Sequence, residues 1–353
     1  MHLLKQTFLI AALVLVGFGC NGAIDSSGTT EGGSVVDSGS TAPTTVIATP
    51  TEAPSDVYAL FSLNVQDFSY PELSAETVNR VIDIHETYQV PVDIYLTSTI
   101  VDLYEEVDPD LITRLRTSPV VAISYHVRPP YPYHSQGYDL LGWDGMSAGE
   151  MYDAVMNYET HEIDLTTGEV TDEAGGYAYL KELFGYAPYV VGSASQGEVA
   201  RAVNDVYTDL GAQFIVAHSQ YGVGNLGATK DGLYLRPEHY DLKLFAEVGK
   251  AAEDVVTSAF DAAITADGAR APWFVGIKMH DNDFFAEDSA WVTVYLAKGA
   301  RKGPPYNTDL QSALLSDADA AAQWELYEET VAYVSEHYQS VNAPGLLQLL
   351  AAD

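Results

Sequence analysis

From Val57 onward, short apolar runs alternate with stretches that have the periodicity of amphipathic helices. Continuous apolar runs of four to eight residues are typical of buried strands, and strands that alternate with helices predict a parallel sheet or barrel. We expect strands over 57–64, 90–96, 120–125, 187–193, 213–217, 233–236 and 273–279, and helices over 74–88, 109–116, 176–184, 196–210, 254–264 and 320–337. The pattern indicates an α/β domain, in which Ser74 is the expected N-cap of the first helix.

The first 55 residues lack this alternation. A basic start, a short apolar core at 7–16 and small residues before Cys20 are typical of an export signal. The segment resembles a bacterial lipoprotein signal, which implies that Cys20 carries a lipid and is the sole membrane contact; an ordinary secretory signal is the alternative. We expect a signal peptide at 1–20, a Ser/Thr/Gly/Pro tether at 21–55 and one domain at 56–353, exported to the periplasm or the cell surface.

The charge balance restricts the partners that the domain can bind. The chain has 50 acidic and 16 basic residues, which gives a net charge of −34. Such a chain repels nucleic acid, and no basic patch is visible in its sequence. The 24 tyrosines and 11 phenylalanines favour a carbohydrate partner, because aromatic rings commonly line sugar-binding grooves.

Four predicted strands end in a side chain that is capable of chemistry: Asp67, His126, His218 and His280. In α/β barrels the functional groups gather at the carboxyl ends of the strands. One carboxylate and two imidazoles form a common ligand set for a divalent ion such as zinc, and Asp67, His126 and His134 supply these groups. The ion would activate a water molecule, and His280 would serve as the general acid.

The order of these groups resembles that of the polysaccharide deacetylases, which are metal-dependent carbohydrate esterases. The resemblance covers residues 57–345. The family's Thr-Phe-Asp-Asp motif corresponds to Asn64-Val65-Gln66-Asp67, its histidine pair to His126 and His134, and its Leu-x-His motif to Lys278-Met279-His280. The resemblance implies a distorted (β/α) barrel of about seven parallel strands. It also implies a zinc-dependent hydrolase that removes acyl groups from a polysaccharide or oligosaccharide.

The chain departs from the family pattern at two places. Gln66 stands at the position of the catalytic base, and a glutamine cannot accept a proton at neutral pH. Asp281 and Asp283 are therefore the candidate replacements. The second departure is the histidine pair, because His126 and His134 are eight residues apart and the family's pair is four apart.

The remaining candidates are substrate contacts beyond the strand ends. Arg128 and Tyr131 belong to an Arg-x-Pro segment that lies earlier than the corresponding family motif, and His218 follows the fifth predicted strand. Two other functions stay open. A glycoside hydrolase would use two carboxylates among Asp67, Asp281 and Asp283, and a carbohydrate-binding surface lipoprotein would need no catalytic group.

Overall fold

The computed structural model describes residues 56–128, 145–192, 197–216, 224–297 and 300–352. The expected signal peptide, Cys20 and the tether lie outside these residues, as do Tyr131, His134 and His218. Within the described part of the chain, no helix combines the length and the apolar character needed to cross a membrane.

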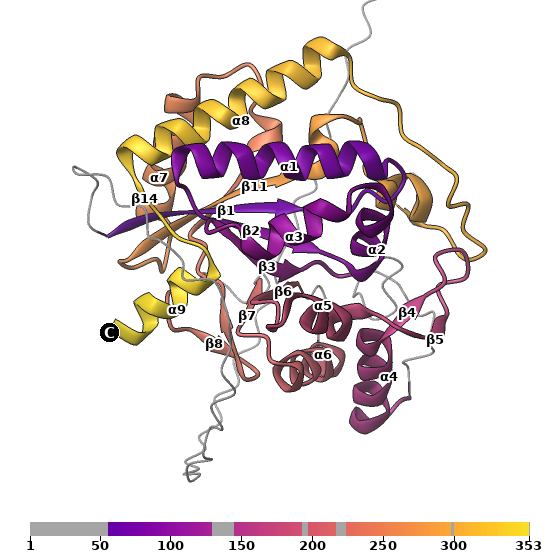
Figure 1. Ribbon diagram of the computed structural model, residues 1–353. Helices are drawn as coiled ribbons and strands as arrows, with labels where there is room; N and C mark the ends of the chain where they lie inside the picture. The colour runs from indigo at the N-terminus through magenta and orange to yellow at the C-terminus, as the bar shows by residue number, and fades with distance from the viewer. Residues whose placement is uncertain (1–55, 129–144, 193–196, 217–223, 298–299, 353) are drawn as a thin grey trace, which may run out of the picture. The chain divides into compact units, whose positions relative to one another are not determined.

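A curled sheet of mostly parallel strands forms the centre of the domain (Figure 1). Its neighbours follow the order β10-β11-β1-β2-β3-β6-β7-β9-β8, and only the β8–β9 pair on this path is antiparallel. The strands are β1 (Val57–Asn64), β2 (Val92–Leu96), β3 (Val121–Tyr125), β6 (Val190–Gly192), β7 (Phe214–Val216), β8 (Thr229–Lys230), β9 (Leu233–Leu235), β10 (Tyr240–Lys243), β11 (Trp273–His280) and the short β14 (Gln339–Ser340) beside β1. The predicted distorted (β/α) barrel is confirmed.

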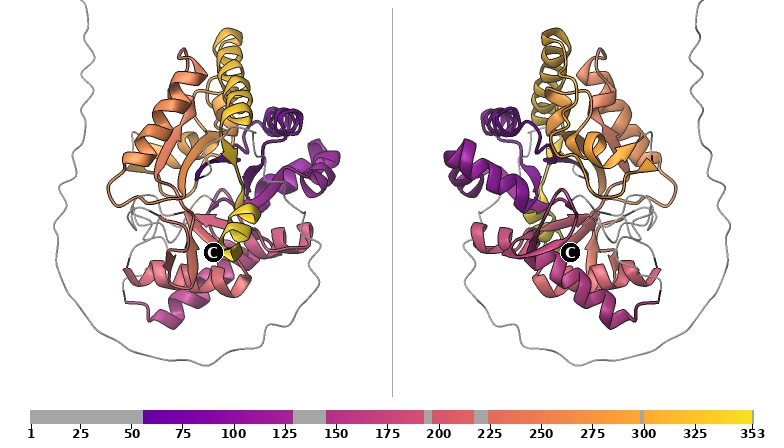
Figure 2. Two further views of the ribbon diagram at one scale, coloured as in Figure 1. Left: turned by 90° about the vertical axis from the view of Figure 1, so that its left-hand side faces the viewer. Right: turned by 90° about the vertical axis from the view of Figure 1, so that its right-hand side faces the viewer.

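Helices cover the outer face of this sheet (Figure 2). They are α1 (Pro71–Tyr88), α2 (Ser98–Val107), α3 (Pro109–Thr117), α4 (Ala148–Thr160), α5 (Gly176–Phe184), α6 (Gly197–Leu210), α7 (Ala252–Thr265) and α8 (Asp317–His337). The last helix, α9 (Ala343–Ala352), instead packs against the inward-facing side chains of the sheet. Alternate residues of β1 face the outer helices, as period-2 geometry requires. Phe61, for example, meets His85 of α1 at 5.1 Å and Tyr327 of α8 at 6.4 Å between ring centroids.

The opposite face of β1 points into the barrel, and its character changes along the strand. Tyr58 and Leu60 join an apolar cluster that includes Phe274 of β11 and Leu346 of α9. The next inward positions are the polar residues Ser62 and Asn64. The amino-terminal end of the barrel is therefore filled with apolar side chains, whereas the carboxyl-terminal end is hydrophilic.

Four residues, Arg236 to His239, connect β9 at one side of the sheet to β10 at the other. Arg236 donates its amide to Ile215 of β7 at 2.9 Å. His239 donates its amide to the Phe274 carbonyl at 2.9 Å, and its Nδ1 accepts the Phe274 amide at 2.8 Å. These bonds hold the curled sheet together where no strand pair joins β9 to β10.

The start of α1 differs from the prediction. The helix begins at Pro71, which is favoured in the first turn because it lacks an amide hydrogen. Ser74 is therefore inside the first turn, where it is buried and donates its hydroxyl to Asp281 at 2.6 Å. The hairpin of β4 (His161–Ile163) and β5 (Val170–Ala174) lies between α4 and α5.

Candidate active site

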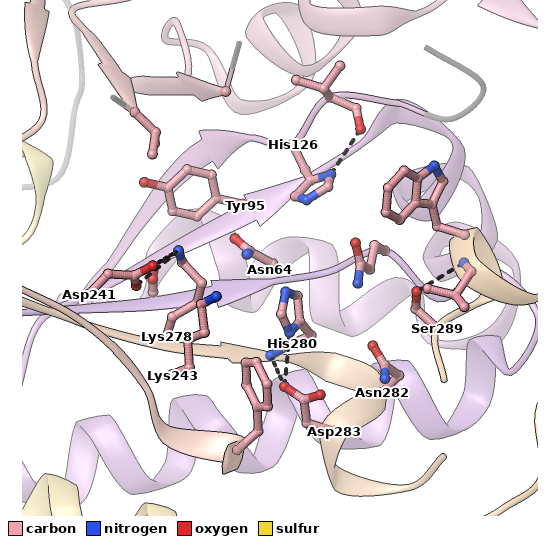
Figure 3. Close-up of a pocket in the computed structure, with 18 of the residues that line it drawn as sticks. Asn64, Tyr95, His126, Asp241, Lys243, Lys278, His280, Asn282, Asp283 and Ser289 are labelled. Carbon is pink, nitrogen blue, oxygen red and sulfur yellow. Dashed lines mark hydrogen bonds and ion pairs between the residues drawn. The ribbon is translucent and has the colours of Figure 1, made fainter. Parts of the chain in front are cut away.

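A cavity of about 510 Å³ opens at the carboxyl ends of the parallel strands, where α/β barrels place their functional groups (Figure 3). Residues that are register partners on neighbouring strands form rows across part of the cavity wall. His280 of β11 pairs with Asn64 of β1, which pairs with Tyr95 of β2. The other cavity-lining residues used below are Ser62, Gln66, His126, Arg236, Glu238, Asp241, Lys243, Phe245, Lys278, Asn282, Asp283, Glu287 and Trp291.

His280 is held from two sides at the end of β11. A 3-10 helix, Asp281–Phe284, follows the strand and turns the chain so that Asp283 faces back to His280. The Asp283 carboxylate accepts the His280 amide at 2.7 Å and the His280 Nδ1–H at 3.0 Å. The Phe245 ring lies 5.3 Å from the imidazole between centroids. This arrangement fixes the tautomer and the direction of the ring, as in His–carboxylate pairs that transfer protons.

His126 lies across the cavity from His280, and Asn64 lies between the two rings (Figure 3). It follows β3, and its amide donates to the Leu96 carbonyl at 2.9 Å, which continues the β2–β3 ladder by one residue. Its Nδ1 lies 2.9 Å from the carbonyl of Val127. The structure thus brings together the two predicted histidines that it describes.

Neutral amides and an ion pair complete this part of the wall. The carboxamides of Asn64, Gln66 and Asn282 line the cavity. Lys278, one register row below His280, donates to Asp241 of the neighbouring strand at 3.1 Å. Amide N–H groups are suitable donors to an oxygen atom on which negative charge develops.

Asp67 and Asp281 form a buried pair behind the wall and do not line the cavity. The Asp67 carboxylate accepts Ser69 N at 2.9 Å and Ser69 Oγ at 2.7 Å through Oδ1, and Ala290 N at 3.0 Å through Oδ2. Asp281 accepts the amides of Gln66 and Asp67 and the hydroxyl of Ser74. Burial, with a smaller contribution from the charge of Asp67, raises the pKa of Asp281 to about 7, and burial also raises the pKa of Asp67.

The predicted zinc ligands do not fit a metal within the described residues. No three His, Cys, Asp or Glu side chains among them lie close enough to hold an ion. Asp67 would have to give up hydrogen bonds to three donors. The set of Asp67, His126 and His134 stays a prediction, because His134 lies outside the described residues.

Arg128, the predicted substrate contact, is fully buried outside the cavity. Its guanidinium donates to the carbonyl of Tyr158, to the carbonyl of His161 at 2.9 Å and to Ser98 Oγ at 3.2 Å. It also lies 4.7 Å from the centroid of the Tyr158 ring. These contacts connect the end of β3 to α4 and to the β4–β5 hairpin.

The charged cavity residues of β9, of β10 and of the connection between them were not among the site residues predicted from the sequence. Arg236, Glu238, Asp241 and Lys243 all line the cavity. The signal was present, because Asp241 and Lys243 alternate with the buried Leu242 as the residues of a one-sided strand do. The strands expected from the sequence leave 237–253 unassigned, so this alternation was not recognised.

No protein-family model matches the sequence, and no curated protein matches it. Solved structures that resemble the chain include a probable polysaccharide deacetylase from Pseudomonas aeruginosa PAO1, with 12% identity over 84% of this chain and 91% of that one and a TM-score of 0.46. Another is the peptidoglycan deacetylase PdaC from Bacillus subtilis, with 12% identity, coverages of 85% and 95%, and a TM-score of 0.38.

The 4-alpha-glucanotransferase from Thermococcus litoralis matches 83% of this chain at 12% identity, with a TM-score of 0.45. This chain covers 40% of that protein's length. Polysaccharide and peptidoglycan deacetylases thus occur among the solved structures that the chain resembles. A pseudoenzyme from Bacillus anthracis is also among these structures, with 10% identity, coverages of 83% and 66%, and a TM-score of 0.36. All of these TM-scores lie below 0.5, so the likenesses do not assign a function to this chain.

Proposed function

We propose that the cavity is the active site of a hydrolase that removes acyl groups from a carbohydrate. The observation that carries this proposal is the His280–Asp283 pair, which lies on the wall of a strand-end cavity together with His126 and three carboxamides. The Phe245 and Trp291 side chains also line the cavity, and aromatic rings of this kind pack on the apolar faces of sugars.

In the proposed reaction His280 moves the proton and Asp283 holds its ring. The imidazole takes a proton from a water molecule, whose oxygen attacks the acyl carbon, and the C=O electrons move onto the carbonyl oxygen. Carboxamide N–H groups of Asn64 and Asn282 stabilise this oxyanion. When the oxyanion collapses, the bond to the sugar oxygen or nitrogen breaks and His280 returns the proton to the leaving group. The products are the free carboxylic acid and the deacylated sugar.

Zinc dependence is a separate part of the proposal. It requires His134 to join His126 and the carboxylate of Asp67 to leave its hydrogen bonds. The reaction above uses only groups that line the cavity, so an assay with and without a chelator separates the two versions.

The test is acetate release from O-acetylated and N-acetylated oligosaccharides, measured with an enzyme-coupled assay. We expect turnover by the wild-type chain and a loss of at least about 100-fold for His280→Ala, which is the usual contribution of a general acid–base group. Glu287→Gln, which changes an exposed carboxylate on the same cavity, is the matched control and should retain activity. The absence of acetate release from every substrate would refute the proposal.

A glycoside hydrolase is the second candidate, because Glu238, Asp241 and Asp283 bring carboxylates to the cavity. Asp67 and Asp281 cannot serve in their described positions, since both are buried behind the wall. Release of reducing sugar without release of acetate would favour this candidate.

A further inference from the structure

A second polar row lies beneath the row that contains His280. Ser62 of β1 pairs in register with Lys278 of β11 on one side and with Asp93 of β2 on the other. Arg236 reaches this row across the barrel interior from the end of β9, and its Nη2 lies 3.6 Å from Asp93 Oδ2. The exposed fractions of Ser62, Asp93 and Arg236 are 4%, 0% and 2%, so this row is sheltered from bulk solvent.

Several polar atoms of this row have unused hydrogen-bonding capacity. Arg236 uses Nη1 to bind Glu238, and its Nη2 has an ion-pair contact with Asp93 Oδ2 that is too long for a hydrogen bond, so neither Nε nor Nη2 makes a hydrogen bond among the described residues. The same holds for Ser62 Oγ within those ranges. Nε and Nη2 form one edge of the guanidinium, which can bind two oxygen atoms side by side. A buried donor without a hydrogen-bond partner costs about 1–3 kcal/mol, so a ligand oxygen placed at this edge would recover that cost.

The charges of the row are already balanced. Its three cations are Arg236, Lys278 and Lys243, which pairs in register with Lys278, and they are matched by the three carboxylates of Asp93, Glu238 and Asp241. An anionic ligand would find no surplus positive charge here and would approach a chain of net charge −34. Hydroxyl groups fit better, because each one both donates and accepts. Ser62, Arg236 and Glu238 all line the cavity and offer donors and acceptors.

Among the described residues, apolar side chains close this end of the cavity below the row. Tyr58, Leu60 and Phe274 fill the barrel beneath it, and Leu346 of α9 packs into the same apolar cluster. A ligand can therefore enter this row from the cavity mouth but cannot continue through the barrel. The terminal sugar of a chain fits a pocket that is open at one end only, whereas an internal sugar needs room for the chain to continue on both sides of it.

We propose that the deep end of the cavity binds a neutral, terminal sugar residue through neighbouring hydroxyl groups, held by the Nε–Nη2 edge of Arg236, by Ser62 and by Glu238. If the chain is the proposed deacylase, this site implies that acyl groups are removed at the ends of sugar chains, and that claim rests on the proposed function. The binding itself does not depend on catalysis and is tested separately.

The binding test is isothermal titration of the purified full chain with methyl glycosides of glucose, galactose, mannose and N-acetylglucosamine, and with methyl glucuronide as the acidic probe. We expect at least one neutral glycoside to bind and the glucuronide to bind about tenfold more weakly or worse. Ser62→Ala should weaken the neutral ligand about fivefold, the value of one hydrogen bond. Arg236→Lys keeps the charge but loses the planar edge, and should weaken it about tenfold.

Ser340→Ala is the matched control, because Ser340 Oγ is also buried and has no hydrogen-bond partner among the described residues, and Ser340 does not line the cavity. Both serine variants should keep the wild-type melting temperature, and only Ser62→Ala should change binding. Equal affinities for Ser62→Ala and the wild type would overturn the inference. So would tighter binding of the glucuronide, or no binding by any glycoside.

The claim about chain ends is tested with an N-acetylated tetrasaccharide that carries ¹⁸O at its reducing end. Fragmentation mass spectrometry then reports which residue loses its acetyl group first. We expect loss from one terminal residue, and first loss from internal residues would overturn the claim. If the wild-type chain binds glycosides but deacylates nothing, the proposed function fails and the sugar site stands.

Discussion

Replacing Asp67 by alanine distinguishes two roles for this residue, that of a metal ligand and that of a structural anchor. The wild-type carboxylate holds the turn after β1 through Ser69 and the segment after β11 through the Ala290 amide. In Asp67→Ala the buried Ala290 amide and the part-buried Ser69 amide lose their partner. At about 1–3 kcal/mol for each, the cost is about 2–6 kcal/mol.

One effect acts in the opposite direction. The charge of Asp67 contributes to the raised pKa of Asp281, so its removal relieves a repulsion between two buried carboxylates. We therefore expect a net loss of about 3 kcal/mol. For a domain of about 300 residues that loss corresponds to a fall in melting temperature of about 5 °C.

The assay is differential scanning calorimetry of both chains, with and without EDTA and with added zinc. We expect the melting temperature to fall in Asp67→Ala even in EDTA, while Glu287→Gln, an exposed carboxylate on the cavity, melts like the wild type. If Asp67→Ala matched the wild type in EDTA and lost only a stabilisation by zinc, the structural role would be refuted and the metal-ligand prediction supported.

Three further outcomes are expected. Asp283→Asn should lower kcat about 100-fold with little change in KM, because His280 loses the group that orients it; a pH–rate profile identical to that of the wild type would contradict this. Burial raises the pKa of Asp281 to about 7 and of Asp93 to about 6, so folding favours their protonated forms. The two protonated aspartates stabilise the fold at about pH 4, and this stabilisation is lost as the pH rises through 6 to 7. We therefore expect the melting temperature, measured in 0.5 M salt, to increase from pH 8 to pH 5, and the absence of an increase would contradict this. Arg128→Lys should lower the free energy of unfolding by about 3 kcal/mol, measured by urea denaturation, and leave the KM of the folded fraction unchanged.

The sequence predicted the elements in which the local pattern and the tertiary structure agree. The predicted strand over 57–64 and the helix over 176–184 coincide with β1 and α5. His126 and His280 line the cavity, where the sequence placed the candidate site, because the carboxyl ends of parallel strands all lie at the same edge of a barrel.

The rest depends on contacts that a linear pattern does not contain. Whether Asp67 faces a cavity or the protein interior is decided by the Ala290 amide, 223 residues away. Arg236 became part of the site because the curled sheet brings the end of β9 opposite Asp93 on β2. The first helix begins at Pro71, and Ser74, inside its first turn, donates its hydroxyl to Asp281, 207 residues further on.

The segment between β11 and α8 forms one wall of the cavity, and its anchors are distant in sequence. Its contacts include Gln311 to the Ser69 carbonyl, Tyr70 to the Ser312 carbonyl and the Tyr306 amide to the Thr166 carbonyl. Each of these contacts closes a loop of well over 100 residues, which makes it entropically costly until the barrel has formed. We therefore expect this wall of the cavity to form only after β11 has paired with β1, because that pairing already brings the last third of the chain to the first.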